Sequence, residues 1–266
     1  MSKDELHYDN THITFLEKLW GDGFMSPGGK QEIKKLLKGL NLKKQKILDI
    51  GCGSGGITVS LIDDYGAQKV IGVDVEKDVV KVARDRVSKN GLKDKIDILL
   101  IDKSSLPFNK DTFDMVFSKD SFVHIPDKER IFTQVFKVLK PGGVFVFSDW
   151  LISHDHKPSK EMEYYLKLED LGFGMASPLV YSKALKKSGF VAIKTNNRNK
   201  WYKDEARREL EILSGPSRKS YEDITSKGFI ENQINTWKAM IKVLDTGEHC
   251  PCLLYTSPSP RDGLGS

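Results

Sequence analysis

The stretch that most constrains the fold runs from Lys46 to Gly56 and reads KILDIGCGSGG. Residues 47–50 form an apolar run interrupted only by Asp49, which predicts a buried parallel strand. Glycines follow at once, and the pattern over residues 57–62 then indicates the start of a helix. Glycine lets a backbone approach a ligand closely, and the free N–H groups at the start of a helix donate to it. The arrangement predicts a nucleotide-type binding site.

The chain that follows alternates between strand and helix patterns. Further strands are expected over residues 69–74, 96–101, 113–118 and 144–150, with helices over residues 79–88 and 128–139. Five strands alternating with helices predict an α/β fold with a doubly wound, mostly parallel sheet.

The outer segments have helical spacing. Apolar residues recur at that spacing over residues 11–20 and 31–37, before the first strand. Beyond Trp150 we expect helices over residues 161–168 and 178–187, a sixth strand over 191–195, and amphipathic helices over 202–213 and 229–244. These patterns divide the chain into an N-terminal lid (1–29), a core (30–200), a helical cap (201–249) and a tail (250–266).

The tail has the composition of a loop. Translated back into DNA, residues 252–262 resemble a transposase sequencing-library adapter, so residues 250–266 are expected to be non-native or disordered. The natural chain would then continue differently after Pro251. A seventh strand, inserted antiparallel between the fifth and the sixth, is expected to be missing.

Composition restricts the class of partner. The 266 residues carry a net charge of +5, and the lysines between Lys34 and Lys46 are best explained as a solvated helix face, so no nucleic acid is expected. No signal peptide and no membrane-spanning run are expected. Three cysteines without metal spacing suit a reducing, cytoplasmic compartment. His154 and His156 flank Asp155, but these three residues are too few to predict a metal site. The expected assembly is a monomer or weak homodimer.

The glycines alone leave two kinds of cofactor open. Gly51, Gly53 and Gly56 satisfy G-x-G-x-x-G, and Asp74 follows about twenty residues later, as in dinucleotide enzymes. Asp49, however, precedes the first glycine, where a carboxylate suits a cation better than a phosphate. Asp102 ends the third strand, where it could bind an adenine amine. Acids at three consecutive strand ends favour a cationic nucleoside.

Four motifs then resemble class I S-adenosylmethionine-dependent methyltransferases. They are LDIGCGSG at 48–55, GVD at 72–74, FDMV at 113–116 and LKPGG at 139–143, and they cover about residues 45–150. The resemblance implies a Rossmann-like fold with S-adenosyl-L-methionine as the cofactor. It implies cofactor-binding roles for residues of the glycine turn, the strand ends and the N-terminal loop: Met25, Ser26, Asp49, Gly51, Cys52, Gly53, Asp74, Val75, Asp102, Lys103 and Lys119.

A narrower resemblance lies in the outer motifs. Tyr8, FMSPGG at 24–29, SKDSFVHI at 118–125 and SDW at 148–150 resemble phosphoethanolamine N-methyltransferases and the sarcosine and dimethylglycine N-methyltransferases. This implies that Tyr8, Asp120 and His124 are catalytic and that Trp150 and Tyr165 bind substrate. The chain departs from the phosphoethanolamine enzymes where Glu169 takes the place of a phosphate-binding arginine and Leu171 that of a tyrosine. The identity of the small amine therefore stays open.

The implied roles agree with the chemistry of amine methylation. An amine that is charged near pH 7 must lose a proton before it takes a methyl group. His124 can take the proton, Asp120 can orient and stabilise the imidazolium, and Tyr8 can hydrogen-bond to both and exclude water. The alternatives are a small-molecule O- or C-methyltransferase and an inactive S-adenosylmethionine-binding protein.

Overall fold

The computed structural model describes residues 8–103 and 105–258. Its centre is a seven-stranded sheet in the order β3-β2-β1-β4-β5-β7-β6. All neighbouring strands from β3 to β5 are parallel, and β7 runs antiparallel to both of its neighbours. The strands are β1 (Lys46–Ile50), β2 (Lys69–Asp74), β3 (Ile96–Leu100), β4 (Phe113–Lys119), β5 (Leu139–Asp149), β6 (Phe190–Asn197) and β7 (Cys252–Pro258).

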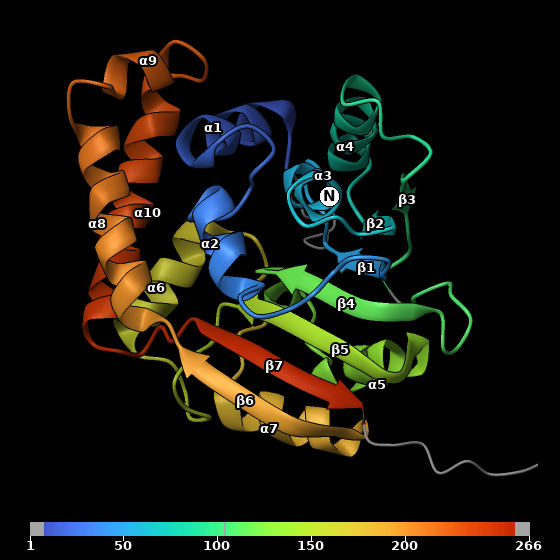
Figure 1. Ribbon diagram of the computed structural model, residues 1–266. Helices are drawn as coiled ribbons and strands as arrows, with labels where there is room; N and C mark the ends of the chain where they lie inside the picture. The colour runs from blue at the N-terminus through green and yellow to red at the C-terminus, as the bar shows by residue number, and fades with distance from the viewer. Residues whose placement is uncertain (1–7, 104, 259–266) are drawn as a thin grey trace, which may run out of the picture.

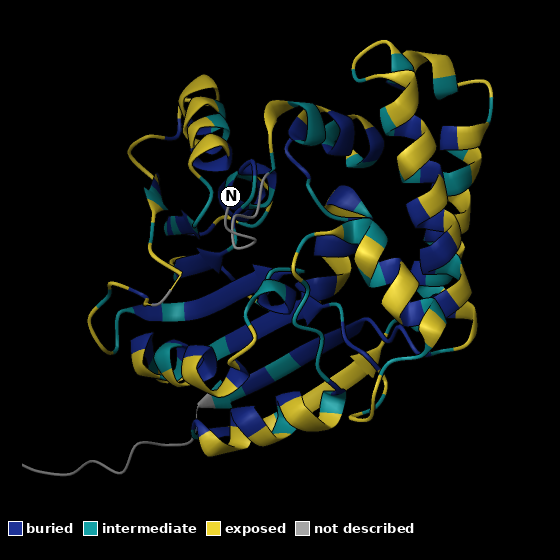
Figure 2. Ribbon diagram, turned by 180° about the vertical axis from the view of Figure 1, so that it is seen from behind, coloured by how far each residue is buried: buried dark blue, intermediate teal, exposed yellow. Residues whose placement is uncertain are grey.

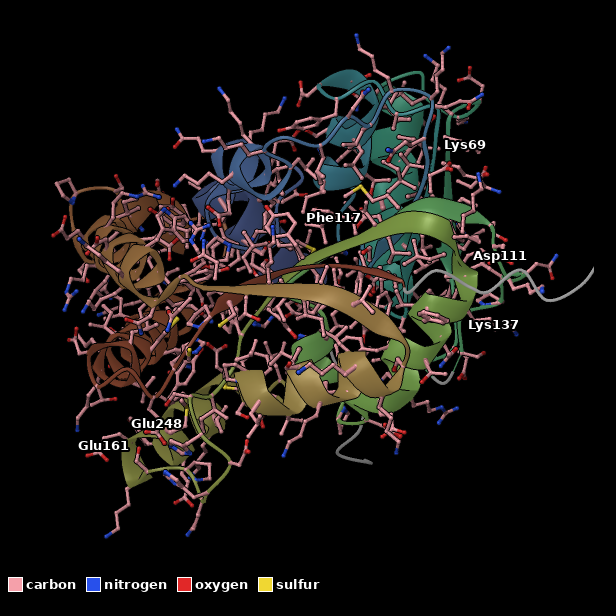
Figure 3. The ribbon with its side chains drawn as sticks, turned by 60° about the horizontal axis from the view of Figure 1, so that its bottom comes forward. Lys69, Asp111, Phe117, Lys137, Glu161 and Glu248 are labelled. Atoms are coloured by element: carbon pink, nitrogen blue, oxygen red, sulfur yellow. The ribbon has the colours of Figure 1, made fainter. Side chains whose placement is uncertain are left out.

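Helices cover both faces of the sheet (Figure 1). On one face lie α2 (Gly29–Leu36), α3 (Gly56–Asp63) and α4 (Lys77–Lys89), and on the other lie α5 (Lys128–Val138) and α7 (Pro178–Lys187). Most side chains of the central strands are buried, among them that of Phe117 of β4, which is labelled in Figure 3. Figure 2 shows the burial concentrated in the sheet and on the inner faces of its helices. The predicted doubly wound α/β fold is confirmed.

A third hydrophobic core lies beside the sheet. It joins α1 (Asn10–Trp20) and α6 (Lys160–Glu169) to α8 (Asn199–Ser214), α9 (Arg218–Glu222) and α10 (Lys227–Asp245). The start of α6 is fixed by Glu248, which accepts hydrogen bonds from the backbone N–H and the hydroxyl of Ser159. Glu161 pairs with Lys242 of α10, and Figure 3 shows Glu161 and Glu248 close together at this end of the molecule. The cap therefore packs on the N-terminal helix α1 and on α6.

The predicted loss of the seventh strand is wrong. Cys252–Pro258 forms β7, with Leu254 opposite Phe147 of β5 and opposite Thr195 of β6. Cys252, Leu253 and Leu254 are buried. The sequence has a strand-like run at residues 253–255, but the resemblance of this segment to adapter DNA excluded it from the predicted fold; in the structure it pairs with β5 on one edge and with β6 on the other. The expected disordered tail is thus corrected for residues 252–258, while residues 259–262 of the adapter-like segment lie outside the described part of the chain.

Candidate active site

A cavity of about 280 Å³ opens at the carboxyl ends of β1, β2 and β4, where parallel sheets bind ligands. It is lined by all the predicted site residues except Asp49, Trp150 and Tyr165. Those on its lining are Tyr8, Met25, Ser26, Gly51, Cys52, Gly53, Asp74, Val75, Asp102, Lys103, Lys119, Asp120 and His124. Residues from the N-terminal segment and from the ends of the strands therefore meet in one space.

The glycine turn between β1 and α3 uses left-handed backbone at Gly51 (φ 68°), Gly53 (φ 53°) and Gly55 (φ 89°). A Cβ atom at Gly51 would lie 2.0 Å from the Ser121 hydroxyl, so a side chain does not fit there. The turn therefore needs glycine both for its conformation and for close approach.

Asp74 closes the other side of the turn at the end of β2. Its carboxylate accepts hydrogen bonds from the backbone N–H groups of Gly53 (3.0 Å), Val75 (2.8 Å) and Glu76 (3.1 Å). Burial raises the pKa of the carboxyl group, and these three donors oppose the shift. Asp74 thus braces the turn while it lines the cavity.

Asp49 lies beneath the turn and is not on the cavity lining. Its side chain is buried and accepts a hydrogen bond from the Thr58 hydroxyl at 2.7 Å, which joins β1 to α3. Burial raises the pKa of this carboxyl group to about 7, with the Thr58 contact as a partial offset. A cofactor-binding role for Asp49 stays a prediction, and the described contact is internal.

The N-terminal segment is docked directly on the glycine turn. The backbone N–H of Gly56 donates to the carbonyl of Gly23 at 2.9 Å. Arg86 of α4 then joins three parts of the chain, because it donates to the Ser54 carbonyl (2.8 Å) and to the carboxylates of Glu17 (2.8 Å) and Asp22 (2.7 Å). The loop that carries Met25 and Ser26 is thereby held over the turn.

Asp120 follows β4 in a left-handed conformation (φ 54°), which is uncommon outside glycine and marks many functional positions. Its buried carboxylate pairs with Lys119 at 2.6 Å and accepts hydrogen bonds from Ser148 (2.9 Å) and from Tyr202 (3.1 Å). Sequence reasoning missed Ser148 and Tyr202. Tyr202 comes from the cap, some eighty residues away, and no local pattern connects it to the strand ends.

His124 ends a single 3-10 turn, η1 (Phe122–His124), after β4. Its Nδ1 lies 3.3 Å from the carbonyl of Leu171, and its ring packs 5.1 Å from that of Phe173 and 6.5 Å from that of Tyr8. The structure therefore departs from the expected pair, since a backbone carbonyl and not Asp120 orients the imidazole. Burial lowers the pKa of His124 to about 4, so the ring is neutral at pH 7.

The Tyr8 hydroxyl lies in a negative field. Burial is the main cause of its raised pKa, and four carboxylates add to it: Glu169, Asp74, Glu76 and Asp120. The phenol thus stays protonated and lies between the acids of the cavity and the end of α6. The field around it favours a positively charged ligand.

The two remaining predicted residues, Trp150 and Tyr165, lie in an aromatic cluster with His249, in the third core against which Tyr8 also packs. Ring centroids are separated by 5.4 Å for Trp150 and His249 and by 5.7 Å for Tyr165 and His249. Trp150 also faces Phe173 at 5.6 Å. His249 was missed by sequence reasoning because it follows the last helix of the cap, far from any strand end in the chain.

Among the described residues, no group of three or more His, Cys, Asp or Glu side chains could hold a metal ion. No helix in the described part of the chain is long and apolar enough to cross a membrane.

Comparison with known proteins agrees with this fold. The family model described as a methyltransferase domain matches residues 41–213, so the chain belongs to the methyltransferase-domain family. Phosphoethanolamine N-methyltransferase 1 of Zea mays is 32% identical over 254 residues, which are 92% of this chain and 48% of the relative. The chain spans about half the length of the curated relatives it matches.

Two solved structures are similar over nearly the whole chain. Phosphoethanolamine N-methyltransferase 2 of Haemonchus contortus, in complex with phosphomonomethylethanolamine and S-adenosylhomocysteine, matches with a TM-score of 0.88 and 25% identity, over 98% of this chain and 61% of the other. A putative sarcosine dimethylglycine methyltransferase of Galdieria sulphuraria matches with a TM-score of 0.79 and 21% identity, over 93% and 98%. The second likeness supports the fold alone.

Proposed function

We propose that the chain is an S-adenosylmethionine-dependent methyltransferase that N-methylates a small polar amine. The observation that carries the proposal is a single cavity in which the glycine turn, Asp74 and Asp102 meet Tyr8 and His124. Nucleoside-binding groups and a proton acceptor then line one space. The family match and the similarity to N-methyltransferases support the same activity.

The residues present fit the cofactor. The turn at Gly51 and Gly53 leaves no side chain between the backbone and the cavity, and the nearest atom to a Cβ at Gly53 would be the Met25 sulfur at 3.5 Å. Asp74 offers an acceptor suited to ribose hydroxyls, and Asp102 with Lys103 lies at the end of the space where the base would fit. When bound, S-adenosylmethionine supplies a methyl group on a positively charged sulfur.

The protein's own residues position and deprotonate the amine. His124 is neutral at pH 7, and a neutral ring that faces a carbonyl donates from Nδ1, so its Nε2 carries a lone pair. That lone pair can accept the proton that the charged amine must lose before its nitrogen attacks the methyl group. Tyr8 covers this end of the cavity and keeps water out. Asp120 holds Lys119 and Tyr202 in place around it, as a positioning residue.

The remaining expectations extend this proposal. The domain division into lid (1–29), core (30–200) and cap (201–249) is supported by the separate hydrophobic core of the cap, although α1 shares that core. A cytoplasmic location and a monomer or weak homodimer stay predictions.

The test is the formation of S-adenosylhomocysteine from S-adenosylmethionine with a panel of small amines, thiols, alcohols and carboxylates. We expect turnover with amines. Turnover with an alcohol, a carboxylate or a thiol alone would assign an O- or S-methyltransferase instead. Cofactor binding without turnover of any member would favour an inactive cofactor-binding protein.

A further inference from the structure

Lys128, the first residue of α5, is a lysine whose ammonium group is buried. The residue is 3% exposed, and its Nζ donates to three backbone carbonyls, those of Phe122 (2.6 Å), Ile125 (2.6 Å) and Gly174 (2.9 Å). Burial of a charge costs free energy, and a cation is also unfavourable at the N-terminal end of a helix. The position of Lys128 is therefore not explained by the helix that it begins.

The three acceptors belong to two segments that meet at His124. Phe122 begins the turn η1 and Ile125 follows its last residue, so their carbonyls lie on either side of His124 in the chain. Gly174 lies in residues 170–177, the connector between α6 and α7. One nitrogen atom thus joins the turn that carries His124 to this connector.

The connector supplies the groups that orient His124. The carbonyl of Leu171 lies 3.3 Å from Nδ1 of His124, and the ring of Phe173 lies 5.1 Å from the imidazole. The backbone N–H of Gly174 donates to the carbonyl of Val123 at 2.6 Å. The Leu171 carbonyl keeps the hydrogen on Nδ1 and leaves Nε2 as the acceptor. A connector that moved away from the turn would release the imidazole from this orientation.

Lys128 is charged at pH 7, as these contacts require. Burial lowers its pKa to about 8, and Asp149 at the end of β5 opposes this shift. An ammonium group has three hydrogens for the three carbonyls, whereas a neutral amine has two. Asp149 in turn accepts hydrogen bonds from the Val123 N–H (3.1 Å) and from the Tyr181 hydroxyl. Lys128 and Asp149 thus hold the same turn.

The charge of Lys128 also acts on His124. Burial is the main cause of the low pKa of the imidazole, and the positive charges of Lys128 and Lys103 add to it. Tyr8, whose ring also faces His124, stays protonated because burial raises its pKa. Removal of Lys128 should therefore loosen the turn and raise the pKa of His124.

We propose that Lys128 is a positioning residue for methyl transfer: its ammonium group holds the connector against the turn and thereby fixes the imidazole of His124 with Nε2 available to accept a proton. Lys128 is not among the described residues that line the cavity, so it acts through His124 and not on the substrate. The inference rests on the proposed N-methyltransferase function, in which His124 takes the proton of the amine.

The kinetic test is Lys128→Met, which keeps the length of the side chain and removes its charge and its three donors. With the amine that the wild type methylates best, kcat should fall at least about tenfold, because a misoriented base loses part of its effect of about 10²–10⁴-fold. The Kd for S-adenosylmethionine, measured by calorimetry, should be unchanged. Lys137→Met makes the same change at an exposed position of α5 and should leave kcat unchanged. An unchanged kcat in Lys128→Met, or an equal fall in Lys137→Met, would overturn the inference.

A double-mutant cycle separates positioning of His124 from a general loss of structure. If Lys128 acts through His124, Lys128→Met should lower kcat no further in the background of His124→Asn. An equal fall of kcat in both backgrounds would assign Lys128 a structural role and contradict the inference, while the N-methyltransferase proposal would stand.

A readout without turnover is the pKa of His124 itself, measured by NMR on the full chain labelled with ¹³C at the histidine Cε1 atoms. The resonance of His124 is the one that His124→Asn removes. Its pKa should be higher in Lys128→Met than in the wild type and in Lys137→Met, and an equal pKa in all three would count against the inference. If the wild type binds cofactor but methylates no amine, the proposed function fails, and this titration alone decides whether Lys128 positions the imidazole.

Gly174→Ala decides the matter if Lys128→Met does not fold. It leaves the ammonium group in place, but a Cβ atom at Gly174 would lie 3.2 Å from Cα of Pro126, so the connector must move away from the turn. We expect a lower kcat with unchanged cofactor affinity, a higher pKa of His124, and no further loss of kcat in the background of His124→Asn. A kcat and a pKa equal to those of the wild type in Gly174→Ala would refute the inference.

Discussion

Removal of the Arg86 side chain tests whether the N-terminal segment forms part of the cofactor site. Arg86 is 13% exposed and joins α4 to Glu17, Asp22 and the Ser54 carbonyl. Asp22 is 86% exposed, so its pair contributes less than about 1 kcal/mol. Glu17 is 18% exposed and accepts a charge-assisted hydrogen bond that contributes about 1.5–3 kcal/mol. Because Arg86→Met also removes the hydrogen bond to the Ser54 carbonyl, it should weaken the docking of the N-terminal segment by about 2–4 kcal/mol in total.

The assay has two parts. Hydrogen exchange should accelerate in residues 9–29 of Arg86→Met, and the KM for S-adenosylmethionine should rise by at least about tenfold, since 1.4 kcal/mol corresponds to a factor of ten. The effect on kcat at saturating cofactor should be smaller. Arg84→Met is the matched control, because Arg84 lies on the same helix and, within the part of the chain that the structure describes, donates only to the Ile98 carbonyl of β3 at 2.9 Å.

Two results would refute the reasoning. One is unchanged exchange in residues 9–29 of Arg86→Met. The other is an equal change in Arg84→Met, which would assign the effect to loss of α4 stability. A double-mutant cycle with Glu17→Gln separates the buried pair from the other contacts, and we expect the two changes to be clearly non-additive.

Four further outcomes are expected. Asp120→Asn leaves Lys119 buried (1% exposed) without its counter-charge, so unfolding should become easier by about 3–5 kcal/mol, and a thermal melt within 1 °C of wild type would contradict this. His124→Asn should lower amine turnover about 10²–10⁴-fold with cofactor affinity unchanged by calorimetry. The pKa of His249 is about 4 in the folded chain and 6.5 ordinarily, so the unfolded chain takes up a proton at this ring first as the pH falls. The folded state therefore loses stability between pH 6.5 and pH 4. In denaturant titrations over this range, the free energy of unfolding of His249→Gln should fall less steeply with pH than that of the wild type. A chain ended at Pro251 loses β7 and should lack a cooperative melt, and an unchanged melt would show that β7 adds little.

The parts of the fold that could be predicted are those in which a segment carries its own signal. The strand at Lys69–Asp74 and the helix at Pro178–Lys187 have the predicted bounds, because an apolar run and an N-terminal proline with a capping serine mark them locally. The strand at Cys252–Pro258 has a shorter signal, the strand-like run of residues 253–255, and hydrogen bonds to β5 and β6 stabilise it on both of its edges. This run was excluded from the predicted fold because the segment resembles translated adapter DNA.

The same difference separates the two halves of the site. The glycine turn and Asp74 could be predicted because the carboxyl ends of parallel strands lie at the same edge of the sheet. A residue that follows a predicted strand is therefore expected at that edge. Glu169, Tyr202 and His249 come from the cap and from α6, whose placement depends on helix packing in the third core. For two of the predicted site residues, the structure shows other partners than the predicted ones. Asp120 and His124 are four residues apart, yet the left-handed backbone at Asp120 directs its carboxylate to Lys119, Ser148 and Tyr202.

The N-terminal segment connects these two halves mechanically. Asp9 caps α1 through the His12 N–H, so Tyr8 stands immediately before a fixed helix start. The other end of α1 is held by Trp20, which donates to Glu209 of α8 at 2.6 Å, and Glu209 also accepts from Trp237 of α10 at 2.9 Å. The loop after α1 then binds the glycine turn through Gly23 and Gly56. The segment from Tyr8 to Met25 thus contacts the glycine turn, the end of the cavity near His124, and the cap. Because a ligand that orders this segment at one end of the cavity also orders it at the other, binding of cofactor and of substrate should be thermodynamically coupled.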